Sequence, residues 1–436
     1  MTNDTRETHL ANGLMVLLKP VGTAPVVTFW VWYRVGSRNE VPGITGISHW
    51  VEHMMFKGTP TLKKGEIMHL VNRNGGVDNA FTWTDFTTYF EMLPSERVDL
   101  ALRIESDRMV NSLFDPDEVA SERTVIISER EGAENEPRFW LAEEVQATAF
   151  KVHPYHHDTI GWKTDLETMS RDDLYNHYRT YYAPNNAIIV AAGDFEPDEM
   201  LAKIEKAFGA IPRGHDVPPV KSVEPLQEGE RRVRLRRPGP TPYFHTAYHA
   251  PQASDPDFFP VFVLAGVLSG VGGMSFSGQG SPGRSSRLYR ALVETGLAAD
   301  VGCGFRATID PGVIDVTATV RPGVPVEKVE RAILTELEKI TAKPITDAEL
   351  AKVIKQAKTQ FVYATDGVMN IGYWLGLLEI VASYKMYDTF LENLVKVSKS
   401  DVQRVAAKYL AETNRTVGWF IPTDGATNKR ALRRQR

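Results

Sequence analysis

The sequence contains only one cysteine, Cys303, among 436 residues. A single thiol cannot form a disulfide within the chain, and it cannot supply the thiolate cluster of a cysteine-based metal site. Long apolar runs are also missing, because no stretch reaches the roughly 20 residues that a membrane-spanning helix needs. The first residues, Met1 to Thr8, contain no apolar signal segment. These absences favour a cytoplasmic protein without a membrane span; a periplasmic protein whose signal peptide has been removed is the alternative.

The sequence also lacks a large excess of positive or negative charge. The chain has 50 Lys and Arg residues against 55 Asp and Glu residues, for a formal net charge of −5 at pH 7. Proteins that bind nucleic acid normally carry a basic excess, so the sequence predicts no nucleic-acid partner. The basic residues 429–436 are interpreted as a solvated tail and not as a binding arm.

The second half of the chain repeats features of the first half. Such a long chain is expected to form at least two domains. Four positions recur 228 residues later: Ser170, Leu174, Tyr181 and Asn186 correspond to Ser398, Val402, Tyr409 and Asn414. This duplication predicts two similar α+β domains. The proline-containing stretch 213–230 lacks apolar periodicity and is predicted to link domains 1–212 and 231–436.

One stretch of the first half carries a pattern typical of metal sites. His49, Glu52 and His53 have the spacing His-x-x-Glu-His, and on a helix these positions lie on one face. Two imidazoles suit zinc, which in catalytic sites keeps one position open for water. The carboxylate between them is then a candidate general base beside that water. The pattern is the zincin motif in reverse, and it predicts a zinc site on a helix.

A second predicted helix offers a third ligand. Residues 115–117 are expected to open this helix, as Thr45 or Ser48 is expected to cap the first one. Glu122 and Glu129 are seven residues apart and therefore share a face of the second helix. One of them could bind the metal while the other contacts a ligand. A solvated acidic face is the alternative interpretation of this helix.

These residues resemble the zinc site of the pitrilysin family of metallopeptidases, which includes insulin-degrading enzyme and the β subunit of the mitochondrial processing peptidase. The resemblance includes the interval of 76 residues between His53 and Glu129. The length of the chain resembles that of the family members, bacterial homologues among them, that are built from two halves. Further matches cover most of the first half: Phe56–Thr59, Asn79–Thr82, Tyr89, Glu122, His153–Tyr155, Tyr181–Asn186 and Gly193–Asp194.

The resemblance implies a fold and a mechanism. The fold would be two homologous α/β-roll domains, each a mostly antiparallel sheet with helices on one face, which face each other as a clamshell. The activity would be that of a zinc endopeptidase, in which His49, His53 and Glu129 bind Zn²⁺. Glu52 would act as general base, and Glu122 would orient a ligand histidine from behind.

The resemblance also implies where a peptide substrate binds. The strand around Asn79, Ala80 and Phe81 resembles the edge strand of the family, where an extended peptide adds as a further strand. Only the first half carries the metal motif, because residues 258–270 contain no His or Glu. The second half is therefore expected to hold substrate or to be structural.

A partner subunit is expected because one feature of self-sufficient family members is missing. Their second half carries an Arg and a Tyr that hold substrate. In the corresponding stretch, Arg287–Ala299, these two positions are occupied by Val293 and Ala299, while Tyr289 and Arg290 lie nearby but are displaced. The chain is therefore expected to form a heterodimer with a homologous subunit that lacks the zinc motif and supplies the pair.

Two other functions remain open at this stage. A non-catalytic scaffold subunit, like the core subunits of respiratory complexes with this fold, would have no need for an intact zinc motif. A zinc hydrolase acting on a non-peptide bond is the third candidate. The glycine-rich stretch 266–283 lacks the lysine of a phosphate loop and is interpreted as a flexible loop. Two groups are expected to be structural: His153, His156 and His157 in a loop, and Trp30, Trp32, Trp83 and Trp374 in the core.

Overall fold

The computed structural model describes residues 5–272 and 283–423. The chain forms two compact units, each of which contains one segment from the opposite half of the sequence. The first unit comprises Met1–Glu131, His157–Ser222 and Thr365–Asp388, and the second comprises Gly132–His156, Val223–Ala364 and Thr389–Arg436.

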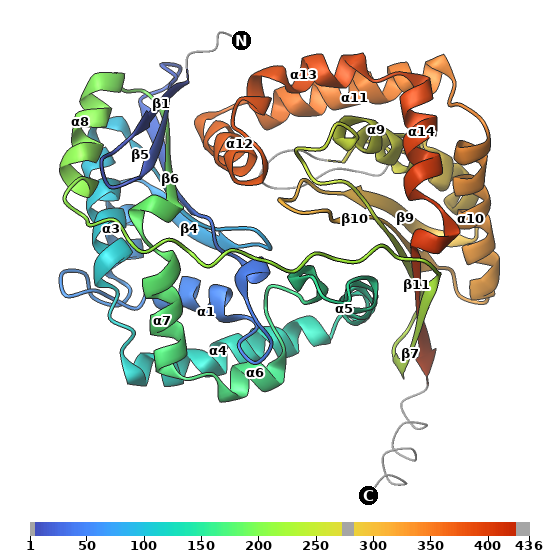
Figure 1. The fold of residues 1–436 in the computed structure, drawn as a ribbon, viewed down its shortest axis with the longest axis horizontal. Helices are drawn as coiled ribbons and strands as arrows, with labels where there is room; N and C mark the ends of the chain where they lie inside the picture. The colour runs from blue at the N-terminus through green and yellow to red at the C-terminus, as the bar shows by residue number, and fades with distance from the viewer. Residues whose placement is uncertain (1–4, 273–282, 424–436) are drawn as a thin grey trace, which may run out of the picture. The chain divides into compact units, whose positions relative to one another are not determined.

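A six-stranded sheet forms the centre of the first unit (Figure 1). Its strand order is β1-β2-β6-β3-β5-β4; β2 and β6 are parallel, and the other neighbours are antiparallel. β4 therefore lies at one edge of the sheet. The strands are β1 (Arg6–His9), β2 (Met15–Pro20), β3 (Val26–Tyr33), β4 (Val77–Thr82), β5 (Thr87–Pro94) and β6 (Ala187–Gly193).

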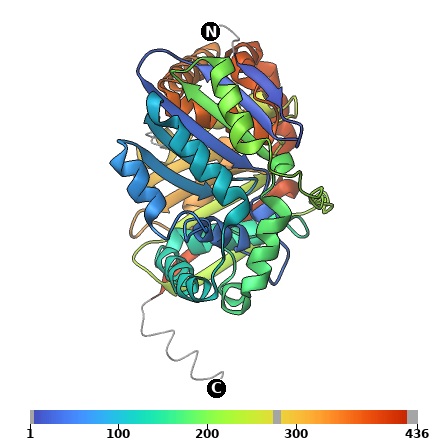
Figure 2. The ribbon, with the colours of Figure 1, turned by 90° about the vertical axis from the view of Figure 1, so that its left-hand side faces the viewer.

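Alternation along β3 explains why both faces of this sheet are covered. Phe29 and Val31 point into the larger core, which helices of the first half cover (Figure 2). The intervening Trp30 and Trp32 are fully buried on the other face, against α12 (Val368–Val381). Apart from α5 (Pro137–Ala149), the α-helices of the first half are α1 (Ile47–Met54), α2 (Glu66–Arg73), α3 (Val98–Asn111), α4 (Pro116–Glu134), α6 (Lys163–Thr168), α7 (Arg171–Tyr181) and α8 (Pro197–Phe208).

The second unit repeats this arrangement around a five-stranded sheet with the order β7-β11-β8-β10-β9. α5 (Pro137–Ala149) from the first half covers one face, where Leu141 and Val145 pack on Ala247 and Phe420. The strands are β7 (Arg231–Pro238), β8 (Tyr243–His249), β9 (Ala298–Phe305), β10 (Val313–Val320) and β11 (Arg415–Thr423). The remaining helices are α9 (Phe258–Ser269), α10 (Val326–Ala342), α11 (Asp347–Ala364), α13 (Met386–Lys396) and α14 (Lys399–Tyr409).

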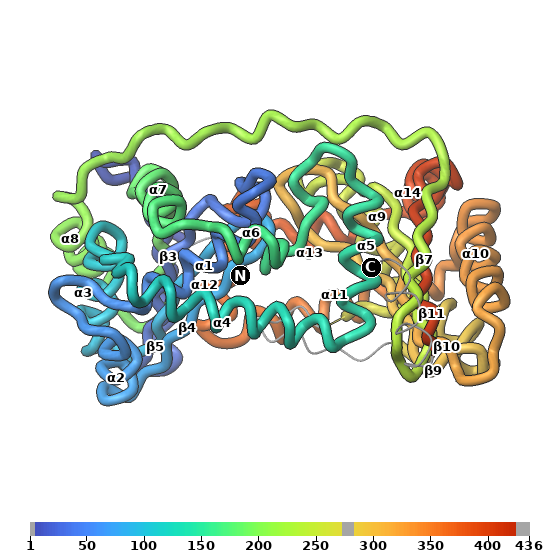
Figure 3. The backbone as a smooth tube through the Cα atoms, turned by 90° about the horizontal axis from the view of Figure 1, so that it is seen from below, coloured from blue at the N-terminus to red at the C-terminus, as the bar shows by residue number. Residues whose placement is uncertain are grey.

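Residues 212–230 contain no helix or strand and run as extended chain after α8 (Figure 3). α9 follows β8 as α1 follows β3, and its sequence lacks His and Glu. The predicted class, two α+β domains each with a mostly antiparallel sheet, is confirmed. Each sheet also carries one helix from the opposite half on its second face.

Two expectations about single residues are wrong. Trp83 is 39% exposed, because it lies in the turn between β4 and β5 and not in a strand. Neither Thr45 nor Ser48 caps α1 through its side chain; the cap position is Gly46. Part of the glycine-rich stretch, 273–282, and the basic residues 429–436 lie outside the described residues. Among those that are described, no helix combines the length and the apolar character that crossing a bilayer requires.

Candidate active site

The helix α1 directs His49 and His53 away from the core because its apolar residues occupy the buried face. Ile47, Trp50 and Val51 are fully buried in the core of the first unit. His49 and His53 project from a different side, with their side chains about one-fifth exposed and their rings 4.6 Å apart. The spacing of four residues along α1 therefore places both imidazoles on one side of the helix, where they can bind the same metal ion.

The helix α4 brings a carboxylate to these histidines. Its first turn is capped by Asp115, whose Oδ1 accepts hydrogen bonds from the amides of Asp117 and Glu118. Oε2 of Glu129 lies 3.9 Å from Nε2 of His49 and 3.8 Å from Nε2 of His53. In the described part of the chain, these three residues are the only group of three possible ligands whose donor atoms lie within 4.8 Å of one another.

The donor set fits a zinc ion. Two imidazole nitrogens and one carboxylate oxygen are typical zinc ligands, and donors of a tetrahedral zinc lie about 3.4 Å apart. The separations of 3.8 and 3.9 Å are close to this value. Burial and then the neighbouring His53 lower the pKa of His49 to about 3. His49 is therefore neutral at physiological pH, which a metal ligand must be.

Glu122 contacts His53 at Nδ1, the ring nitrogen that does not face Glu129. Its Oε1 lies 2.8 Å from Nδ1 of His53, and its other oxygen pairs with Lys57. Because an ionised carboxylate only accepts hydrogen bonds, Nδ1 must carry the proton and Nε2 keeps a lone pair toward Glu129. Burial raises the pKa of Glu122, but the hydrogen bonds from His53 and Lys57 outweigh it and hold the pKa below the ordinary value. Burial lowers the pKa of His53, whereas the Glu122 hydrogen bond and nearby carboxylates raise it overall.

Glu52 lies in the same turn of α1 and is almost completely buried. Thr82, at the end of β4, donates a hydrogen bond of 2.6 Å from Oγ1 to Oε2 of Glu52. Burial raises the pKa of Glu52 to about 7, although the Thr82 hydrogen bond opposes the shift. A carboxyl group that titrates near neutral pH is suited to accept and return a proton.

The strand β4 carries the three predicted substrate residues. Ala80 is buried toward α1, whereas the ring of Phe81 lies against Trp30 and Trp32 on the other face. Oδ1 of Asn79 accepts a hydrogen bond of 2.8 Å from the Ala80 amide. β4 pairs with β5 on one side only and is an edge of the described sheet.

The loop histidines have the structural contacts that were expected of them. Nε2 of His153 lies 3.1 Å from Asp310, and its Nδ1 accepts from the Tyr155 amide. Nδ1 of His156 lies 3.0 Å from the carbonyl oxygen of His153. Nε2 of His157 lies 2.9 Å from Glu40. None of these histidines belongs to the described group of possible metal ligands.

Sequence reasoning assigned no role to two residues that contact the site, Thr82 and Lys57. Both lie in segments that resemble the family, Phe56–Thr59 and Asn79–Thr82. Lys57 stands three residues beyond the end of α1 at Met54, so that helical spacing does not place it near Glu122. No local pattern points from Thr82 to Glu52, which is 30 residues away.

Comparison with known proteins identifies the family of this chain. Residues 15–162 match the model described as insulinase (peptidase family M16), and residues 168–357 match that of the peptidase M16 inactive domain. The chain belongs to the M16 (insulinase/pitrilysin) peptidase family. This is the family that the sequence resembles, and the description of the second model agrees with the lack of a metal motif in the second half.

Relatives in this family match nearly the whole chain. Zinc protease PqqE of Helicobacter pylori is 28% identical over 419 residues, which cover 95% of this chain and 92% of the relative. The probable mitochondrial-processing peptidase subunit beta of Arabidopsis thaliana is 26% identical over 439 residues, covering 99% and 81%. The crystal structure of a protease from Helicobacter pylori has a TM-score of 0.90 at 28% identity and covers 96% of this chain and 99% of that one.

Proposed function

We propose that this M16 chain is the zinc-binding, catalytic chain of an endopeptidase. The observation that carries the proposal is the convergence of His49, His53 and Glu129 beside the buried carboxyl group of Glu52. The relative of this chain in Helicobacter pylori is named a zinc protease.

His49, His53 and Glu129 would hold the zinc ion, and Glu122 would keep His53 in the tautomer that binds it. When bound, zinc would act as a Lewis acid that polarises a carbonyl group and makes a water molecule acidic near neutral pH. Burial favours the neutral state of His49, in which a ring nitrogen has a lone pair that can bind the metal ion.

Glu52 would move the proton. Its carboxylate accepts a proton from the attacking water and passes it to the nitrogen of the leaving amine. Thr82 holds Oε2 of Glu52, so that Oε1 is the oxygen left for this transfer. A pKa of about 7 allows both directions of transfer near neutral pH.

The substrate would be an extended peptide. An edge strand offers backbone N–H and C=O groups to an added strand, and β4 ends at Thr82, which contacts Glu52. The amide of Ala80, which is bonded to the Asn79 side chain, would exchange this partner for the peptide. Asn79, Ala80 and Phe81 would thus bind substrate mainly through the main chain, which tolerates many sequences.

Metal analysis of four variants tests the assignment of roles. Wild-type protein and Glu52→Gln should retain about one zinc per chain, whereas His49→Ala or Glu129→Gln should lose most of it. Glu52→Gln should also lose the cleavage of a flexible peptide by about a hundredfold or more. His69→Ala, which changes an exposed histidine on the neighbouring helix α2, is the matched control. Loss of zinc from Glu52→Gln would make Glu52 a ligand and contradict the mechanism.

The proposal includes a homologous partner subunit. The side chain of Arg287, a nearby candidate donor, forms two hydrogen bonds with Glu349 and is thereby occupied. Val293 and Ala299 stand where family members carry Arg and Tyr. The Arabidopsis relative is named as a subunit. A heterodimer would restore donors for the developing oxyanion, whose loss typically costs about a hundredfold or more in rate.

Peptide cleavage by the isolated, zinc-saturated chain tests the need for a partner. The rate should be low and should rise about a hundredfold when a homologous subunit that lacks the zinc motif but carries the Arg and Tyr is added. Full activity of the chain alone would contradict the heterodimer. In that case Tyr289→Phe and Arg290→Gln would identify the donors.

A further inference from the structure

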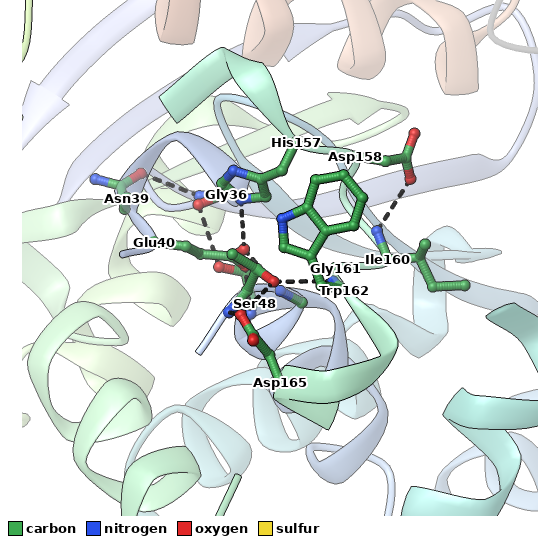
Figure 4. Close-up of polar contacts among 12 residues, drawn as sticks. Gly36, Asn39, Glu40, Ser48, His157, Asp158, Ile160, Gly161, Trp162 and Asp165 are labelled. Atoms are coloured by element: carbon green, nitrogen blue, oxygen red, sulfur yellow. Dashed lines mark hydrogen bonds and ion pairs between the residues drawn. The ribbon is translucent and has the colours of Figure 1, made fainter. Parts of the chain in front are cut away.

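The start of α1 is held by residues that do not belong to α1. The first amides of a helix lack partners within the helix. Here Oε2 of Glu40 accepts from the Gly46 amide at 2.7 Å and Oε1 accepts from the Ser48 amide at 2.9 Å. Glu40 is buried, and its Oε2 also lies 2.9 Å from Nε2 of His157 (Figure 4). A buried carboxylate thus caps α1 and binds it to residue 157.

Asp165 makes a second connection to the same place. Its Oδ2 accepts hydrogen bonds from the amides of Gly43 and Thr45, both at 3.1 Å, and from the Thr45 hydroxyl at 2.7 Å. The Thr45 hydroxyl in turn accepts from the Trp162 amide at 2.9 Å. The backbone of Gly161, with φ of +77°, packs so closely on Thr45 that a Cβ atom there would clash with it. Residues 157–165 are therefore fixed to the residues that precede α1.

The same stretch of chain is bonded to α4. Nη1 of Arg130 donates to the carbonyl oxygen of Gly161 at 3.0 Å, and Arg130 is only 2% exposed. Arg123, two turns earlier on α4, donates to the carbonyl oxygens of Leu166 and Met169. Its guanidinium also lies over the Trp50 ring of α1, 4.8 Å from the ring centre.

These bonds act where the packing of α4 on the core has ended. Val119 and Ile126 bury the earlier part of α4 in the core of the first unit, and Glu122 contacts His53 and Lys57. After Ile126, Arg130 is the only buried residue of α4. Arg130 immediately follows Glu129, so that its bond to Gly161 acts on the backbone that carries this carboxylate.

We propose that residues 157–169, the bridge segment, act as a positioning device that joins α1 to α4 and sets the distance from Glu129 to His49 and His53. Glu40 and Asp165 make the bonds between the bridge segment and the start of α1. Arg123 and Arg130 make the bonds between the bridge segment and α4. The inference rests on the proposed zinc site and adds the residues that determine its affinity. Groups behind the ligands typically change metal affinity by about 10- to 100-fold.

Zinc affinity of the full chain tests the bridge segment. Glu40→Gln and Arg130→Gln should raise the zinc dissociation constant, measured by competition with a chelator, by about tenfold or more. The absorption spectrum of bound Co²⁺ should also change, because its intensity depends on the geometry of the ligands. The milder variant Thr45→Val, which removes only one hydroxyl, should fold and raise the dissociation constant by about threefold or more.

Matched variants in the second unit separate positioning from general stability. Asp401→Asn alters a carboxylate that caps α14, and Arg231→Gln removes an arginine bonded to the carbonyl oxygens of Thr148 and Ala149. Both should lower the melting temperature of the metal-free protein without changing the zinc dissociation constant by more than about twofold.

If the bridge variants, including Thr45→Val, bind zinc as tightly as these two controls, the proposed positioning role of the bridge segment is overturned. A wild-type chain that binds no zinc would instead overturn the proposed function.

Discussion

Glu122 is a single residue outside the group of possible metal ligands that contacts one member of that group. Its carboxylate lies 2.8 Å from Nδ1 of His53 and also pairs with Lys57. It is 4% exposed, so that these interactions are little weakened by solvent.

Replacing Glu122 by Gln should therefore weaken zinc binding without removing a ligand. The amide keeps the shape but lacks the charge that holds the proton on Nδ1 of His53, and we expect the zinc dissociation constant to rise about 10- to 100-fold. Isothermal titration of the metal-free protein measures the effect. Glu118→Gln, which breaks an ion pair with Lys64 one turn earlier on α4, should leave the affinity unchanged. A similar loss in both variants would mean that α4 as a whole is perturbed.

The sequence predicts the site residues that depend on local spacing and misses those that depend on tertiary contacts. His49 and His53 share a face because residues four apart on a helix always do. Glu40 and Arg130 carry no such signal, because their partners are found only after the chain has folded. Trp83 was misplaced because its aromatic ring favoured the core, whereas its position in a tight turn leaves it partly exposed.

At the scale of elements, α12 shows what patterns in the sequence can and cannot predict. Val368–Val381 is apolar on all sides, which is typical of a helix buried on all sides. The sheet on which it packs was not predictable, because neighbours in sequence usually pack together and α12 instead packs on β3. Gly372 and Gly376 make this possible, since a Cβ atom at either position would clash with Trp30 or Trp32.

The edge position of β4 was predictable from the family resemblance, and the strand order agrees with it. The capping of α1 was not predictable. Ser170 and Ser398 cap α7 and α14 through local hydrogen bonds that the sequence pattern indicates. The start of α1 has no local cap and depends on Glu40 and Asp165, which lie outside the helix.

For the whole molecule, the exchange of segments between the halves of the sequence limits how the chain can be divided. Each sheet receives a helix from the other half, α12 on the first sheet and α5 on the second. A half-chain that ends in the linker would leave these faces bare. Large exposed apolar patches promote aggregation.

Residues 1–222 expressed alone should therefore aggregate, because the face that contains Trp30 and Trp32 has lost α12. A fusion of residues 1–131, 157–222 and 365–388, the segments of the first unit, through flexible linkers should remain in solution as a monomer in gel filtration. The fusion with Gly376→Leu is the matched control, because the added side chain cannot fit against Trp32 and should abolish the rescue. A monomeric, cooperatively unfolding fragment 1–222 would show that α12 is dispensable.

The indole pair of β3 gives the protein a built-in optical probe. The rings of Trp30 and Trp32 are stacked with their centres 5.4 Å apart, close enough for their electronic transitions to couple in circular dichroism. The Phe81 ring stands edge-on to both, at 6.4 and 6.3 Å. Since Phe81 belongs to the edge strand β4, a peptide that pairs with this strand would disturb the ring packing. Occupancy of β4 could thus be followed in the near ultraviolet without any attached label.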